Sequence, residues 1–393
     1  MISKCKSLSH VHFYMGVVLF ITLSSCQSDK AGSSGISEIQ PVLGDTIVFN
    51  LDYAPYHQPE FWQTKKGSYF VFYDTQTAKK LSLFDPTGKK VEEISIEKVV
   101  NQLPFDTRKI LFVNKDTMGF CSSNKQRIFW VNWQGDVWDT TYIRPTGAKR
   151  PHYCLFTVGS SIILENKNNL VVEYSRDPVF NSEGLTEIER LTQYYRGYNQ
   201  DSGYIRITNL WSNNSIKYSK LLPQFRFRLD SNYNTAKVGP KSIVKIDEEI
   251  YFYSPYACKL YREDGIEINL KDIKSDLNDE RWIKSQTIKE LISHPMSLSD
   301  ELNNNYGIFS VQEIKRKDKI LVTVKGPSDE SNSYQSCTYI LNHKFEVLYK
   351  FPCSYSLYTA RTFEIDDEVY VQLKKKPFHS FNRTIKYVQV KNI

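Results

Sequence analysis

Residues 69–96 hold three short apolar runs, which read Tyr69-Phe-Val-Phe-Tyr73, Lys80-Leu-Ser-Leu-Phe84 and Val91-Glu-Glu-Ile-Ser-Ile96. The turn Asp85-Pro-Thr-Gly88 separates the second run from the third. Aromatic and β-branched residues are enriched in strands, whereas Pro and Gly mark turns. The stretch therefore predicts a meander of short antiparallel strands.

The same order of strands and turns returns along the chain. Further copies cover residues 118–143, 250–270 and 319–349, and a half-copy at 369–390 lacks a strand that residues 46–51 can supply. Such sheets cannot bury both faces alone, and radial stacking buries the faces while leaving only short edges. We therefore predict an all-β propeller of four-stranded antiparallel blades, closed by the early strand. Six blades fit best, with seven as the alternative because residues 150–240 repeat weakly.

Two segments depart from the strand pattern. Apolar residues recur at helical spacing in the first, at Leu185, Ile188, Leu191 and Tyr195, and again within residues 283–292. This period predicts short amphipathic helices inserted between blades.

The N-terminus has a basic start, a mostly apolar stretch over residues 11–23 and then the sequence Leu23-Ser24-Ser25-Cys26. The apolar stretch is too short to span a bilayer, which takes about 20 residues. Small residues fit a signal peptidase, and the Cys26 thiol can accept a diacylglyceryl group. The pattern predicts a bacterial lipoprotein that is cleaved before Cys26 and held in the membrane by acyl chains, each buried CH2 adding about 0.8 kcal/mol.

These features divide the chain into three parts. Residues 1–25 are the predicted signal peptide, and residues 26–44, rich in Ser and Gly, are a lipidated flexible tether. Residues 45–393 contain no Pro-rich or charged linker and are predicted to form one propeller domain.

The lipobox at Cys26 and blades such as residues 69–96 resemble the uncharacterised propeller lipoproteins of Bacteroidetes, which are known as the DUF4221-type domain of unknown function. The resemblance covers the whole chain and implies a six-bladed propeller. It implies no reaction and no catalytic residues. It favours a protein anchored in the cell envelope, at the outer membrane, on a side that the sequence does not fix.

The sequence lacks the common motifs for catalysis, nucleotide binding and metal binding. There is no HExxH, GxSxG, Walker-type or GxGxxG motif, and Arg281 stands where a calcium loop over residues 276–280 would need Gly. The five histidines beyond the leader are far apart and are expected to be turn or surface residues: His57, His152, His294, His343 and His379. We therefore expect no metal and no cofactor. The net charge of +7 is spread along the chain, so nucleic acid is not an expected partner.

Cysteine spacing is uninformative. Cys337 and Cys353 can pair if their strands are neighbours, but buried free thiols are the favoured reading.

Aromatic residues are abundant, with 26 Tyr, 22 Phe and 6 Trp. Most are expected in the blade cores, while four candidates for a ligand-binding surface flank loops or the first insert: Tyr56, Trp62, Tyr194 and Tyr195. The sequence thus predicts a lipid-anchored propeller that acts as a binding or protein-interaction module. A glycan-binding envelope lipoprotein is the first alternative, and a hydrolase or lyase with a site on the propeller axis is the second.

Overall fold

Blade 1 shows how the sequence pattern becomes structure. In β3 (Gly67–Asp74), alternate side chains point to opposite faces of the sheet, as in any strand. Phe70 and Phe72 pack with residues of the last blade, whereas Val71 and Tyr73 pack with residues of the next. Both faces of the strand are therefore buried, which explains its unbroken apolar run.

The computed structural model describes residues 35–393 except for the following segments: 54–58, 65–66, 75–78, 103–106, 115–116, 123–126, 133, 143–152, 155–161, 167, 176–182, 202, 212–214, 221–241, 255–257, 278–281, 283–291, 294–304, 329–333, 355–356, 366 and 374–383. Residues 36–393 form one compact unit. No helix in the described part of the chain is long and apolar enough to cross a membrane.

The described strands form six antiparallel sheets, which are the blades of a propeller. Blade 1 consists of β2 (Glu60–Thr64), β3, β4 (Lys80–Phe84) and β5 (Lys90–Ser95). Blade 2 consists of β6 (Thr107–Asn114), β7 (Thr117–Ser122), β8 (Arg127–Val131) and β9 (Val137–Tyr142). In blade 3, β10 (Tyr153–Cys154) and β11 (Ile162–Asn166) both pair with β12 (Asn169–Ser175), followed by β13 (Gly203–Thr208) and β14 (Ser215–Lys220).

The remaining blades have four strands each. Blade 4 consists of β15 (Ser242–Ile246), β16 (Glu249–Tyr253), β17 (Lys259–Arg262) and β18 (Glu267–Asn269). Blade 5 consists of β19 (Gly307–Ile314), β20 (Lys319–Ser328), β21 (Tyr334–Leu341) and β22 (Val347–Ser354). Blade 6 consists of β23 (Leu357–Ile365), β24 (Glu368–Leu373), β25 (Thr384–Val390) and, from the other end of the chain, β1 (Leu43–Asn50).

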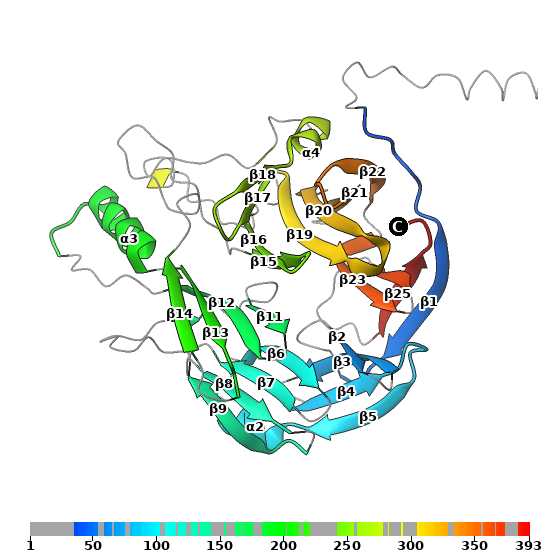
Figure 1. Cartoon of the computed structure of the whole chain (residues 1–393), viewed down its shortest axis with the longest axis horizontal. Coiled ribbons are helices and arrows are strands. Elements are labelled where there is room, and N and C mark those ends of the chain that lie inside the picture. The colour runs from blue at the N-terminus through cyan, green and yellow to red at the C-terminus, as the bar shows by residue number, and fades with distance from the viewer. Residues whose placement is uncertain are drawn as a thin grey trace, which may run out of the picture. The chain divides into compact units, whose positions relative to one another are not determined.

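The first strand of each blade lies toward the centre of the ring and the fourth lies at the outside (Figure 1). First strands of neighbouring blades contact one another, as β15 does with β19 and β19 with β23. β1 pairs with β25 and is the outer strand of blade 6, with Phe49 opposite Ile385. The predicted fold class, the six blades and the closure by the early strand are confirmed.

The buried apolar residues that the structure describes form six clusters, and each cluster lies between two neighbouring blades. The cluster between blades 6 and 1 is the most aromatic: Phe49 of β1 lies 4.6 Å from Phe70, 5.1 Å from Phe72 and 5.5 Å from Phe84, measured between ring centroids. The core of this protein is therefore divided among the blade interfaces, so each blade depends on its neighbours.

The turn between the third and fourth strands repeats with the same hydrogen bonds. In blade 1, Asp85 Oδ1 accepts from the backbone N–H groups of Thr87 and Lys89. Asn132 in blade 2 and Asn342 in blade 5 accept from the equivalent groups. Gly88 has φ +85°, and a Cβ there would lie 2.4 Å from Val48 O of β1. Glycine is needed at this position both for the left-handed backbone and for the close approach of the neighbouring blade.

The pair Asp247-Glu248 is a two-residue turn between β15 and β16, with φ of 48° and 66°. Two left-handed residues are typical of a type I′ hairpin. The pair is therefore a structural turn.

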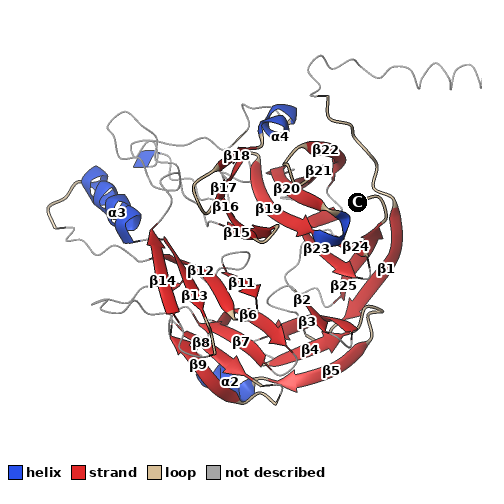
Figure 2. Ribbon diagram, in the orientation of Figure 1, coloured by secondary structure: helices blue, strands red, loops and turns tan. Residues whose placement is uncertain are grey.

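Helices are few, and Figure 2 shows α3 (Glu187–Asp201) at the outer margin of the strands. A capping box begins α3: Thr186 N–H donates to Glu189 Oε2 at 2.9 Å, and Glu189 N–H donates back to Thr186 Oγ1 at 3.3 Å. The predicted first helix is confirmed, but it lies inside blade 3, between β12 and β13, and not between blades. The second predicted helix falls almost wholly outside the described residues. The sequence did not predict α2 (Glu97–Gln102), α4 (Lys271–Asp276) or the 3₁₀ turn η3 (Lys315–Lys317).

Candidate functional site

The predicted surface aromatics do not come together. Trp62 lies in β2 and is only 5% exposed. Its ring packs in the core between blades 1 and 2, 5.7 Å from Tyr69 and 6.2 Å from Phe112. Trp62 is therefore a core residue, and the interpretation that placed it on a ligand-binding surface is wrong.

Of the other candidate residues, the structure describes the side chain of Tyr194 alone. Tyr194 lies on α3 and is partly buried. Tyr195 lies on the same helix, but its side chain is outside the described part of the structure, as is all of Tyr56. The lipobox residues Leu23, Ser24, Ser25 and Cys26 also fall outside the described residues.

A different aromatic pair is exposed. Trp138 of β9 is 50% exposed, and its indole stacks on Trp211 of the β13–β14 turn at 5.6 Å and 25°. Trp211 in turn packs edge-on against the buried Trp130, 4.6 Å away. The Trp211 indole is thus supported by the core, and the Trp138 indole presents ring surface to solvent.

A β-bulge explains the position of Trp138. Trp130 pairs with Asp139 and Val131 with Val137, so Trp138 is the extra residue in the ladder. Bulges redirect a side chain from its regular alternation. Blade 1 carries a similar shift at Val91, and blade 5 carries one at Leu348; both side chains are exposed. The sequence analysis did not identify Trp138 as an exposed aromatic residue. The signal available in the sequence is its position shortly after the turn at Gly135.

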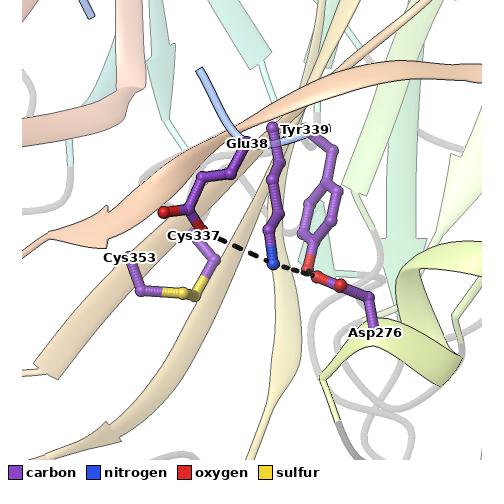
Figure 3. The surroundings of a disulfide bond; sticks show 6 residues. Glu38, Asp276, Cys337, Tyr339 and Cys353 are labelled. Carbon is purple, nitrogen blue, oxygen red and sulfur yellow. Dashed lines mark hydrogen bonds and ion pairs between the residues drawn. A yellow bond between two sulfur atoms is a disulfide. The ribbon is translucent and has the colours of Figure 1, made fainter. Parts of the chain in front are cut away.

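A disulfide joins Cys337 of β21 to Cys353 of β22, with a Cα–Cα distance of 4.2 Å (Figure 3). The favoured sequence reading of buried free thiols is wrong for this pair, because the two strands are neighbours whose bulged register places the cysteines opposite one another. Cys121 and Cys258 are buried thiols outside this disulfide, as expected.

A part-buried ion pair lies beside the disulfide (Figure 3). Lys350 Nζ lies 2.8 Å from Asp276 Oδ2, which also accepts from the Tyr339 hydroxyl at 2.7 Å. Burial, and then the hydrogen bond to the Asp276 carboxylate, raise the pKa of Tyr339 far above its ordinary value. Tyr339 therefore stays protonated and acts as a hydrogen-bond donor. These contacts tie α4 to blade 5.

Residues 36–42, which we call the N-terminal strap, are attached to the propeller. Ile39 N–H donates to Lys350 O at 2.9 Å, and Lys350 N–H donates to Ser37 O at 3.0 Å. Val42 N–H donates to Asn392 Oδ1 at 2.9 Å. The sequence assigned residues 26–44 to a flexible tether, and the structure differs over 36–44. The sequence did not indicate this attachment because the strap binds the edge of β22 through backbone hydrogen bonds. Such bonds require no apolar side chains in the strap.

An enzyme with its site on the propeller axis would use side chains of the inner strands. Gln312 of β19 donates from Nε2 to Thr362 O of β23 at 3.3 Å. Ser310 Oγ and Gln312 Oε1 are buried and have no hydrogen-bond partner in the part of the chain that the structure describes. The first strands of the blades, within their described bounds, contain no histidine. The described inner strands therefore lack the histidine that a metal-dependent axial site would use.

The fold is shared with solved structures. A member of the DUF4221 family from Bacteroides vulgatus matches with a TM-score of 0.62 at 13% identity, over 90% of this chain and 98% of that one. A candidate exported protein from Bacteroides fragilis matches with a TM-score of 0.46 at 11% identity, over 91% and 99% of the two chains. An inactive variant of virginiamycin B lyase from Staphylococcus aureus matches with a TM-score of 0.41 at 11% identity, over 88% and 99%. No protein family model and no curated protein matches the sequence. The expected resemblance is confirmed as a likeness of fold.

Proposed function

We propose that this protein is a lipid-anchored binding module of the bacterial cell envelope, held at the outer membrane by acyl chains on Cys26. The propeller binds the partner, and the lipid holds the propeller at the membrane. Neither role needs a reaction at the axis.

The disulfide between Cys337 and Cys353 is the observation that carries this proposal. Cys353 is exposed, so the bond is open to the thiol reductants of a cytoplasm. Disulfides persist in oxidising compartments such as the bacterial periplasm and the cell surface. An exported location therefore agrees with the leader and its lipobox.

The N-terminal strap sets how far the propeller can lie from the bilayer. Ile36, where the compact unit begins, is the tenth residue after Cys26. An extended chain spans at most about 3.5 Å per residue, which limits the separation to about 35 Å. Such a reach suits a module that binds its partner at the membrane surface.

We expect Cys26→Ser to abolish acylation and release the protein from the membrane fraction, because serine lacks the thiol that accepts the proposed lipid anchor. Metabolic labelling with a radioactive fatty acid, followed by fractionation, measures both effects. Cys5→Ser is the matched control, since Cys5 lies in the leader, and it should leave label and membrane location unchanged. Label retained by Cys26→Ser would contradict the anchor.

A glycan is the second candidate ligand, and the exposed Trp138 indole favours it. Flat aromatic rings stack on the apolar faces of sugar rings, and Trp211 holds the Trp138 ring in place from behind. A ring that is already fixed loses little conformational freedom on binding.

We expect Trp138→Ala to weaken binding of a recognised oligosaccharide by about tenfold, equivalent to about 1.4 kcal/mol. Calorimetric titration of a panel of host and microbial oligosaccharides measures the effect. Tyr142→Ala is the control, because Tyr142 is as exposed but lies under Arg127 and outside the indole stack. Equal binding by wild type and Trp138→Ala would contradict the glycan candidate, and the search would move to cross-linked envelope proteins.

A further inference from the structure

His343 lies in a cluster of carboxylates between blades 4 and 5. The cluster consists of Asp247 from the β15–β16 turn, Glu313 near the end of β19, Asp318 just before β20, and His343 from the β21–β22 turn. The Glu313 side chain is only 6% exposed and that of His343 is 17% exposed. Three separate turns therefore bring their side chains to one place.

The two nitrogens of the His343 ring have different surroundings. Nδ1 is hydrogen-bonded to Asp247 Oδ2. Nε2 is buried and has no hydrogen-bond partner among the described residues. It lies 3.6 Å from Asp318 Oδ1 and 4.0 Å from Glu313 Oε1. A neutral ring that donates from Nδ1 thus turns the lone pair of Nε2 toward two carboxylates.

Glu313 accepts a hydrogen bond from the Asp247 N–H at Oε1 and lies near Lys315 at Oε2. A cation between Nε2 and the two carboxylates would remove the repulsion that is left between these groups. The hydrogen bond from Nδ1 to a carboxylate is also the usual partner of a histidine that binds metal through its other nitrogen. Asp247 then orients the ring, while Nε2, Glu313 and Asp318 are the ligands.

Two of the three separations between the proposed ligand atoms are close to those of a metal site. Zinc bonds of about 2.1 Å in a tetrahedron place two ligand atoms about 3.4 Å apart. The Nε2–oxygen separations of 3.6 and 4.0 Å need only a few tenths of an ångström of closure. Asp318 is exposed, so its side chain can make this adjustment.

The turn that carries His343 is unusual in this protein. The equivalent turns of blades 1 and 2 place Gly88 and Gly135 in the left-handed conformation, whereas blade 5 has Phe345 there with φ 62°. A bulky residue in this region is strained. Phe345 packs against Tyr251 of blade 4, with 5.4 Å between ring centroids. The contact fixes the turn and with it the position of His343 over blade 4.

We propose that Glu313, Asp318 and the Nε2 of His343 bind one divalent transition-metal ion, with Asp247 as the positioning residue. One nitrogen and two carboxylates favour zinc or a similar ion over calcium, which takes oxygen ligands only. Water completes the coordination. The ion joins three positions of blade 5, and the hydrogen bond between His343 and Asp247 connects the site to blade 4. This role is independent of the lipid anchor.

The positive charge of Lys315 would repel the ion. Its Nζ lies 3.9 Å from Glu313 Oε2 and 3.4 Å from Glu248 Oε1. The Lys315 side chain is 60% exposed, so it can turn to solvent when the ion binds. Lys315→Met should therefore tighten binding, a change opposite in sign to the loss of any ligand.

Cobalt titration of the metal-free full-length protein in detergent at neutral pH tests the proposal. We expect one Co²⁺ per chain, with visible d–d absorption that Zn²⁺ abolishes. His343→Gln should remove the absorption, and Asp247→Asn should weaken binding by about 10–100-fold. Asp367→Asn is the matched control, because Asp367 is also a left-handed turn residue, yet pairs with Arg316 at the protein surface. Its titration should equal that of the wild type.

Three results would overturn the metal site. They are a wild-type protein without Co²⁺ absorption, absorption that survives in His343→Gln, and nitrogen NMR showing Nε2 protonated and unaffected by Zn²⁺. The last result would mean that a proton supplies the charge. Thermal unfolding of each variant without metal checks folding, and Asp318→Asn replaces His343→Gln if the latter does not fold.

Discussion

Replacing Cys337 with alanine and Cys353 with serine is expected to lower the free energy of unfolding by about 3 kcal/mol. The bond closes a loop with a sequence separation of 16 residues, and cross-links over loops of this length stabilise by about that amount, by restricting the unfolded chain. Cys337 is fully buried, so alanine avoids placing a hydroxyl in the core. The exposed Cys353 tolerates serine.

Denaturant unfolding with and without reductant measures this effect. The wild type should lose stability on reduction, whereas the double variant should not respond to reductant. Wild-type unfolding that is insensitive to reductant would show that the bond is not formed, and the argument for an oxidising compartment would fail with it.

Phe49→Ala is expected to cost about 4 kcal/mol, in the range for deleting a buried aromatic ring. Phe49 is fully buried, and its ring contacts Phe70, Phe72 and Phe84 of blade 1. It lies on β1, the strand that closes the ring, so the lost contacts are those between the two ends of the propeller. The chain should unfold at lower denaturant concentration as one cooperative unit.

Val91→Ala is the control for this prediction. Val91 also lies on an outer strand but is 52% exposed, and surface substitutions change stability by no more than about 0.5 kcal/mol. A Phe49→Ala protein as stable as Val91→Ala would mean that closure by β1 contributes little to the fold.

The regular blades could be predicted because each repeat is local. The turn at Asp85 and Gly88 and the turn at Gly135 combine a side-chain acceptor or left-handed glycine with flanking apolar runs, and these signals need no tertiary information. Blade 3 lacks this regularity. Its inner edge is divided between β10 and β11, and α3 separates β12 from β13. The repeat was therefore weak between residues 150 and 240.

Burial of Trp62 could not be read from its surroundings in the sequence. Pro55 and Pro59 give the preceding segment the composition of a loop, but residues 60–64 pair with β3 as an inner strand. The disulfide depends on the register of two strands with bulges between them, and a one-residue change in register would separate the cysteines.

The cluster at His343 was hidden for a related reason. Asp247 and His343 lie 96 residues apart, and only the stacking of blade 4 on blade 5 brings them together. The interpretation of His343 as a turn residue is confirmed, but the same turn reaches the neighbouring blade. The one signal in the sequence is Phe345, which stands where comparable turns have glycine.

Intact mass spectrometry of the protein purified from native membranes tests the central claim most directly. The account predicts a chain of residues 26–393 that carries a diacylglyceryl group and acylation on Cys26, and that is two hydrogens lighter than the reduced form. A mass corresponding to the uncleaved leader, or to a cleaved chain without lipid, would contradict a lipid-anchored module of the envelope.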